Sequence, residues 1–138
     1  MKQTPLTRKT WMRRAPRDTG PSLRVRHIVA RRAGEMCEFP ECHVPMQVCH
    51  HRYERSSGGV GPKSPAAAWI NKPVNLLGAC NFHNDWCSNQ HPLEAWRIGW
   101  IVRKGDDPYE TPAMTCHHSL PIYLLDNGKW DTFDERNP

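Results

Sequence analysis

The chain has 138 residues, of which 38% are hydrophobic and 24% are charged. This length fits one domain and excludes two of ordinary size, and no apolar run is long enough to span a membrane. Residues 1–32 hold ten Lys or Arg against one acid, whereas the rest holds nine basic and thirteen acidic side chains. A basic arm on a near-neutral body is typical of proteins that bind a polyanion such as nucleic acid, and a solubilising tail is the alternative.

The six cysteines and eight histidines bear on how such a small core is stabilised. The first twenty residues are polar and basic and contain no apolar segment of a secretory signal, so a cytoplasmic location is expected. Disulfides are rare in that compartment, where clusters of cysteine and histidine instead indicate metal sites. A structural metal would compensate for the thin hydrophobic core.

Residues 1–20 are predicted to form a flexible basic N-terminal arm, because they combine basic residues with proline and glycine. A basic helix is predicted to follow, capped by Ser22 and ending at about Ala33. The expected nucleic-acid contacts of the arm and the helix are Arg13, Arg14, Arg24, Arg31 and Arg32.

Short strands and helices are predicted for the rest of the chain. Strands are predicted at residues 46–53 and 100–103, and residues 73–77 are predicted to form a short strand or an extended segment. Helices are expected over residues 81–87 and 93–98, and a long loop over residues 54–68. An Asp-Asn-Gly turn at residues 126–128 predicts a hairpin near the C-terminus, because Asn-Gly is a strong turn signal.

Two short pairs of residues predict a structural zinc site. Cys37 and Cys42 are separated by four residues, and Cys80 and His83 are separated by two. Two pairs on tight turns can supply four tetrahedral ligands, and thiolates with imidazole suit Zn²⁺ better than Mg²⁺ or Ca²⁺. Cys87, one helical turn after His83, is an alternative ligand. A single ion would join the first turn to the later helix and stabilise the fold.

The other cysteines carry weaker signals. Cys49 lies on a predicted strand and is expected to be a buried thiol. Cys116, His117 and His118 are consecutive, and all three residue types can bind metal. No second pair accompanies them, so a surface loop is the preferred interpretation and metal binding is the alternative.

The tandem pair His50-His51 lies on a predicted strand, so its two side chains point to opposite faces. One imidazole can then bind a cation while the other acts as a base, which is the division of labour that phosphodiester hydrolysis needs. The order of the motifs sharpens this hypothesis. That order is Cys37…Cys42…His50-His51…Asn75-Leu-Leu…Cys80-x-x-His83-Asn84.

With these motifs the sequence resembles the HNH endonuclease family, in particular its small phage and actinobacterial-type members. The resemblance covers roughly residues 24–108. It implies an α+β fold with a ββα-metal (His-Me finger) core, in which two antiparallel strands and a helix surround one catalytic ion. A single HNH nuclease domain would span residues 21–138, with its core at about residues 36–104 and a C-terminal extension over residues 105–138.

The family pattern implies a role for each residue of the site. His51 is the general base, His50 binds the catalytic cation, and Asn75 holds the loop and orients the base. The last ligand falls on Asn84, which makes the chain an HNN variant. In the alternative register of the motif, His83 instead of Asn84 is the last ligand of the catalytic cation. The zinc site then lacks its fourth ligand unless Cys87 supplies it. The first register is preferred because it completes both metal sites.

The expected catalytic cation is Mg²⁺ or Mn²⁺, because both ions favour oxygen ligands such as an amide, and Zn²⁺ and Ni²⁺ are further candidates. Arg52 or Arg55 is expected to contact the scissile phosphate, since an arginine fork matches phosphate oxygens. Arg52 is preferred, because solvated surface charge is the simpler interpretation of Arg55.

The predicted function is that of a metal-dependent DNA endonuclease that nicks or cuts with low sequence preference, as a monomer or weak dimer. No recognition domain accompanies the arm and first helix, and phosphate contacts carry no sequence information. The likeness to phage members also implies genome processing, with terminase or other packaging proteins as partners. The alternative is a non-catalytic, zinc-stabilised nucleic-acid-binding module, which would not need His51.

Overall fold

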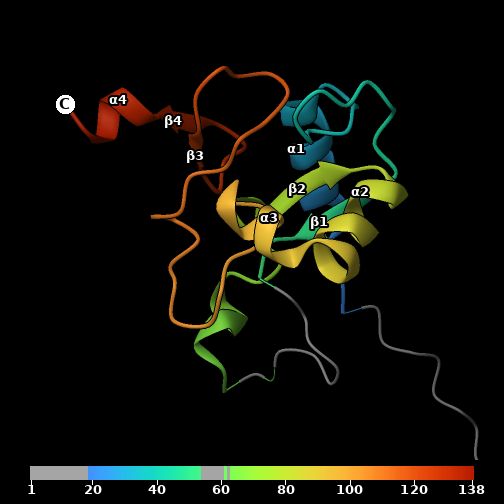
Figure 1. Cartoon of the computed structure of the whole chain (residues 1–138). Coiled ribbons are helices and arrows are strands. Elements are labelled where there is room, and N and C mark those ends of the chain that lie inside the picture. The colour runs from blue at the N-terminus through green and yellow to red at the C-terminus, as the bar shows by residue number, and fades with distance from the viewer. Residues whose placement is uncertain (1–18, 54–60, 62) are drawn as a thin grey trace, which may run out of the picture.

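The computed structural model describes residues 19–53, 61 and 63–138, in which two small antiparallel sheets are accompanied by short helices (Figure 1). The elements are α1 (Leu23–Ala33), β1 (Val48–His51), the 3₁₀-helices η1 (Pro65–Ala68) and η2 (Pro73–Asn75), β2 (Leu76–Ala79), α2 (Asn81–Asp85), the π-helical turn η3 (Trp86–Gln90), α3 (Pro92–Arg97), β3 (Ile122–Leu124), β4 (Trp130–Thr132) and α4 (Phe133–Arg136). A small mixed fold of helices and strands is therefore confirmed. None of the described helices is long and apolar enough to cross a membrane.

Parts of two predictions lie outside the described residues. The basic arm with Arg13 and Arg14 falls on residues 1–18, and most of the predicted long loop falls on residues 54–60 and 62. The described end of that loop contains η1. The predicted flexibility of the arm and its contacts with nucleic acid therefore stay predictions.

Helix α1 begins and ends where the sequence predicts. The Ser22 hydroxyl caps it by accepting a hydrogen bond from the backbone N–H of Val25 at 3.3 Å. Its buried side packs on β2, where Gly78 allows a close approach. A Cβ at Gly78 would stand 3.1 Å from the Cβ of Ala33 and 2.8 Å from the Sδ of Met46. A larger residue at position 78 would therefore displace the Met46 side chain and crowd Ala33 of α1.

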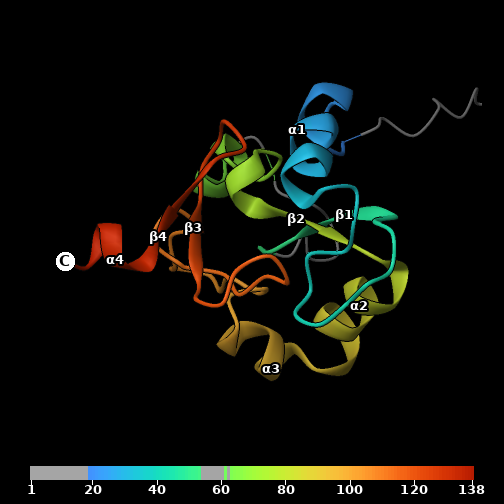
Figure 2. The same ribbon diagram turned by 90° about the horizontal axis from the view of Figure 1, so that it is seen from above.

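Strands β1 and β2 pair antiparallel, with His50 opposite Leu77 and His51 opposite Leu76. Helix α1 lies on one side of this pair, and α2, η3 and α3 lie on the other (Figure 2). His50 is only 1% exposed, whereas His51 is half-buried. The two neighbours thus occupy different environments, as the alternation of side chains along a strand predicts.

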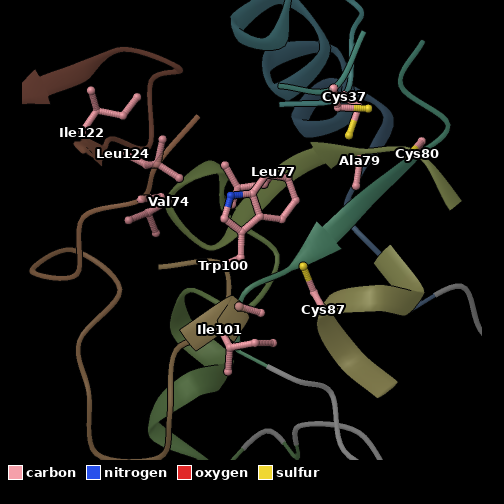
Figure 3. Packing of buried hydrophobic residues seen from close by; sticks show 13 residues of the cluster. Cys37, Val74, Leu77, Ala79, Cys80, Cys87, Trp100, Ile101, Ile122 and Leu124 are labelled. Atoms are coloured by element: carbon pink, nitrogen blue, oxygen red, sulfur yellow. The ribbon is translucent and has the colours of Figure 1, made fainter. Parts of the chain in front are cut away.

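The hydrophobic core extends from β2 through η3 and α3 to β3. Trp100 is fully buried and lies in the middle of the cluster (Figure 3). Its Nε1 donates a hydrogen bond to the carbonyl oxygen of Met114 at 2.8 Å. The strand predicted at residues 100–103 is wrong. This segment joins no strand pair, and the Val102 N–H donates to the carbonyl oxygen of Arg52 at 2.8 Å.

The C-terminal hairpin is confirmed, with β3 and β4 antiparallel and Ile122 opposite Thr132. The helix predicted over residues 81–87 ends earlier, because η3 replaces its last turn. Helix α4 was not predicted. Thr132 and Glu135 form a capping box at its start, in which each side chain accepts from the backbone of the other residue.

A buried ion pair joins α1, the turn that follows it and β2. Arg32 donates from Nε and Nη2 to the two carboxylate oxygens of Glu38 at 3.0 and 2.8 Å, and the two side chains are 1% and 2% exposed. Arg32 also donates to the carbonyl oxygens of Pro73 and Leu76, and Glu38 accepts from the N–H of Gly78. The prediction that Arg32 contacts nucleic acid is therefore wrong, because its guanidinium is enclosed by the protein.

Replacing Glu38 with glutamine should destabilise the fold by about 3–5 kcal/mol, because it leaves the Arg32 charge buried without its partner. Urea unfolding of the zinc-loaded protein, followed by circular dichroism, would measure the change. Glu110→Gln is the control, since the Glu110 side chain is 71% exposed in its pair with Arg136. The control should lose less than about 1 kcal/mol. Equally small losses in both variants would show that the buried pair does not lock these segments together.

Candidate metal centre and catalytic site

The four predicted zinc ligands meet at one point of the fold. The ligand atoms of Cys37, Cys42, Cys80 and His83 all lie within 4.8 Å of one another. Nδ1 of His83 is 3.3 Å from Sγ of Cys80 and 3.7 Å from Sγ of Cys37. A thiolate sulfur and an imidazole nitrogen on one tetrahedral Zn²⁺ stand about 3.6 Å apart. The Cys₃His cluster can therefore hold a structural metal such as zinc.

Local structure explains how the cluster is assembled. The N–H of Cys42 donates to the carbonyl oxygen of Phe39 at 3.0 Å, which closes the turn that carries the first cysteine pair. Cys80 caps α2 and accepts from the N–H of His83, so both ligands lie on the first turn of this helix. The Phe39 ring stacks on the His83 imidazole with centroids 3.9 Å apart and an interplanar angle of 8°. These contacts orient the imidazole so that its Nδ1 faces Cys37 and Cys80.

Burial raises the pKa of the Cys37 thiol to about 12. Such a thiol keeps its proton near neutral pH unless a cation stabilises the thiolate. Burial also raises the pKa of Cys87 to about 12, but Cys87 does not belong to the four-residue cluster found among the described residues. Cys87 lies apart from Cys37 and Cys80 (Figure 3), and the geometry therefore favours the register in which His83 completes the metal centre.

Asn84, directly after His83, contacts the first histidine of the tandem pair. Its Oδ1 lies 2.9 Å from Nδ1 of His50, whose Nε2 lies 2.7 Å from the carbonyl oxygen of Trp100. A carbonyl oxygen can only accept, so Nε2 carries the proton of the neutral imidazole and Nδ1 presents its lone pair. Burial lowers the pKa of His50, which keeps the ring neutral near pH 7.

The contact between His50 and Asn84 therefore brings two lone pairs together. Neighbouring ligands of an octahedral Mg²⁺, each at about 2.1 Å from the ion, stand about 3.0 Å apart. The observed 2.9 Å between Nδ1 and Oδ1 fits this spacing. Turning the Asn84 amide, so that its nitrogen donates to His50, would satisfy the same contact without a cation. The two arrangements differ in whether the site needs a metal ion.

His51 is held by a side chain that the sequence did not single out. Its Nε2 lies 2.8 Å from Oδ1 of Asn71, and the Asn71 amide nitrogen donates to the carbonyl oxygen of Thr19 at 2.8 Å. The Thr19 carbonyl fixes the amide so that its oxygen faces His51. In the neutral imidazole, Nε2 of His51 therefore carries the proton and the lone pair lies on Nδ1. Asn71 selects the tautomer of the proposed base.

Asn75 is fully buried and holds two segments together. Its Oδ1 accepts from the N–H of Tyr53 at 2.9 Å, and its Nδ2 donates to the carbonyl oxygen of Ile70 at 3.0 Å. These bonds fasten the chain just after His51 to the segment before η2, which matches the loop-holding role that the family pattern implies. The side chain that accepts a hydrogen bond from His51 is that of Asn71.

Arg52 is fully buried, so the prediction that it contacts the scissile phosphate is wrong. Its guanidinium donates only to backbone carbonyl oxygens among the described residues. They belong to Val74, Gly99, Pro108 and Thr111. Burial lowers the pKa of Arg52 to about 9, and the surrounding carbonyl dipoles stabilise its charge. Arg52 thereby ties the segment over residues 99–111 to the end of β1.

Two other arginines predicted to bind nucleic acid lie among the described residues and differ in exposure from Arg32. Arg24 and Arg31 are both exposed on α1 and therefore accessible to a polyanion.

No family model matches the chain, and comparisons with curated proteins and with solved structures also find no match. The function is therefore inferred from the geometry of the site.

Proposed function

We propose that the protein is a metal-dependent endonuclease of the HNH type that hydrolyses phosphodiester bonds in DNA. The main support is the 2.9 Å distance between Nδ1 of His50 and Oδ1 of Asn84. His50 lies on β1, the strand that also carries His51. Strands β1 and β2, followed by α2, would form its ββα-metal core. The Cys₃His cluster would hold a structural zinc beside it.

Each residue of the proposed site has a separate task. His50 and Asn84 would hold the catalytic cation, with Mg²⁺ or Mn²⁺ preferred over Zn²⁺ or Ni²⁺ because an amide oxygen is a hard ligand. The cation would stabilise the negative charge that develops on the phosphate and the leaving oxygen. His51 would take a proton from the attacking water at Nδ1, while Asn71 keeps the other proton on Nε2.

DNA is the proposed substrate because the charge distribution favours a polyanion. The first 32 residues carry ten of the nineteen basic side chains, and Arg24 and Arg31 are exposed. Low sequence preference follows, since phosphate contacts do not discriminate between bases. The proposal also includes genome processing with packaging partners, a cytoplasmic location, and a monomeric or weakly dimeric state. These parts rest on the family resemblance and the composition alone.

A plasmid assay tests the proposed cleavage. Zinc-loaded protein is incubated with supercoiled plasmid and either Mg²⁺ or Mn²⁺, and we expect nicked or linear products. Asn84→Ala should require a higher concentration of Mn²⁺ for the same rate, because it removes one ligand of the cation. If wild-type protein retards the plasmid but leaves it intact with both ions, the nuclease proposal fails.

That outcome would favour the second candidate function, a non-catalytic zinc-stabilised nucleic-acid-binding module. One observation supports it. The contact between His50 and Asn84 is also satisfied when the amide is turned, and the site then needs no cation. Mn²⁺ titration of the zinc-loaded protein distinguishes the two functions, because only the nuclease should bind a second ion that His50→Ala removes.

A further inference from the structure

A pocket of about 280 Å³ lies between α1 and the turn of the C-terminal hairpin. Ile28, Arg31 and Arg32 line it from α1, and residues 127–130 line it from the turn and β4. None of these residues belongs to the proposed catalytic site or the Cys₃His cluster. The pocket is thus a separate feature of the surface.

The charge of the pocket is positive. Arg31 and Lys129 are both exposed, and neither forms an ion pair with any described residue. The guanidinium of Arg32 is neutralised by Glu38 and contributes no net charge. No acidic side chain lines the pocket. An anionic group can therefore approach two uncompensated cations without meeting a carboxylate in the lining.

Trp130 provides an exposed aromatic surface beside these charges. Its side chain is among the large hydrophobic groups left accessible, with the residue 40% exposed. The His118 ring meets the indole edge-on, with centroids 4.8 Å apart and an interplanar angle of 68°. Nδ1 of His118 is in turn 3.0 Å from Oγ1 of Thr115. The indole is thus supported from one side and accessible from another.

The consecutive Cys116, His117 and His118 support both walls of the pocket. His117 donates from Nε2 to the carbonyl oxygen of Ala33 at 2.8 Å, at the end of α1, while His118 contacts Trp130. The thiol of Cys116 contacts the carbonyl oxygen of Cys37 at 3.3 Å. These three residues join no metal-ligand group among the described residues. Through these contacts the segment connects the end of α1 to the hairpin.

The turn also fits directly against α1. Gly128 has a φ of +81°, and a Cβ there would stand 2.7 Å from Cγ2 of Ile28. Only glycine combines this backbone conformation with so close an approach. The two walls are therefore held at a fixed separation, so a ligand would not have to order them on binding.

We propose that this pocket binds one nucleotide of a single-stranded polynucleotide, with its base against Trp130 and the adjoining phosphates near Arg31 and Lys129. Cations beside an exposed aromatic ring are the combination that binds single strands, because every unpaired base has a face that can stack. A paired base cannot present that face to the indole. This proposal goes beyond cleavage, since binding here needs neither His51 nor a divalent cation.

Fluorescence anisotropy with a labelled oligothymidylate tests this site. The full-length, zinc-loaded His51→Ala protein is used without added Mg²⁺ or Mn²⁺, so that cleavage plays no part. Trp130→Leu should weaken binding by about 5- to 20-fold, because it removes a stacking surface, and Trp130→Phe should keep most of the affinity. Replacing both Arg31 and Lys129 by glutamine should reduce the slope of log K against log salt by about 1.4, at about 0.7 per phosphate contact.

Matched controls lie on α3, on the other side of the β1–β2 pair from α1 (Figure 2). Trp96 is 38% exposed, but the guanidinium of Arg103 lies over its ring, 4.0 Å from the centroid, so that face is not open to a base. Arg97 is exposed and forms no ion pair with a described residue. Trp96→Leu and Arg97→Gln should leave the affinity and the salt slope unchanged. Circular dichroism confirms that each variant is folded. The proposal is overturned if the control variants weaken binding equally, if Trp130→Phe binds as poorly as Trp130→Leu, or if the pocket variants bind like the parent protein.

Discussion

Replacing His51 with alanine is expected to reduce plasmid cleavage by about 100- to 10,000-fold, the usual contribution of a general base. The lone pair on Nδ1 disappears with the ring, and the attacking water then loses its proton acceptor. The fold should survive, because His51 is half-buried at the last position of β1, whereas its neighbour His50 is enclosed. The rates are measured as conversion of supercoiled plasmid to nicked product at saturating Mn²⁺.

Two comparisons make the His51 result specific. His27→Ala removes an exposed histidine from α1 and should leave the cleavage rate unchanged. The Mn²⁺ concentration that gives half-maximal signal in a binding titration should be the same for His51→Ala as for wild type, because His51 is not a proposed ligand. A His51→Ala protein that cleaves at more than half the wild-type rate would exclude His51 as the base, whatever the other variants do.

Features set by short-range patterns could be predicted from the sequence. The cap at Ser22, the Asn-Gly turn of the hairpin and the two ligand pairs of the metal centre each depend on residues within a few positions of one another. The pairing of His83 with cysteines and of Asn84 with His50 followed from counting ligands for two sites. In the structure, successive residues of α2 reach different partners: His83 contacts Cys80, and Asn84 contacts His50. The catalytic cation itself stays a prediction.

The two wrong arginine predictions have a common cause. Arg32 was assigned to nucleic-acid contacts because it lies on the basic helix, and Arg52 to the scissile phosphate because it follows His51. Both predictions assumed that the arginine is exposed, as arginine usually is. Both are enclosed by carbonyl oxygens from segments far away in the sequence, as far as Thr111 in the case of Arg52. Burial of this kind depends on how distant segments pack, and no local pattern encodes it.

The sequence also could not reveal the support of the proposed base. Asn71 lies twenty positions after His51, in a stretch with no motif of its own. Its role depends on the carbonyl oxygen of Thr19, which lies 52 positions before Asn71 in the chain. The connection that His117 and His118 make between α1 and the hairpin could not be predicted for the same reason. Residue types that can bind metal were visible, but their partners at Ala33 and Trp130 were not.

Loss of the structural metal is expected to have the largest effect on the fold itself. Structural zinc contributes about 10–16 kcal/mol in small zinc-binding peptides, which equals or exceeds the total stability of about 5–15 kcal/mol of a typical domain. Cys37 lies before β1, whereas Cys80 and His83 start α2, so one ion would join both ends of the β1–β2 unit. Cys37→Ser should therefore bind no zinc tightly and lose its cooperative thermal transition.

Metal analysis and circular dichroism test this prediction, with Cys49→Ser as the control. Cys49 is a half-buried thiol on β1 outside the cluster, so its variant should keep about one zinc per chain and a cooperative transition. A Cys37→Ser protein that is folded without zinc would contradict the structural role of the cluster.

The same variant separates the structural metal from the chemistry. Asn84 follows His83 directly, and the 2.9 Å contact between Asn84 and His50 depends on the position of α2. Loss of zinc should therefore abolish cleavage without zinc taking part in the reaction, and added Mn²⁺ should not restore it. Asn84→Ala should instead keep its zinc and its thermal transition while losing cleavage at low Mn²⁺. If both variants lose zinc and unfold together, the two metal sites are one structural unit, and Asn84 has no separate role as a ligand.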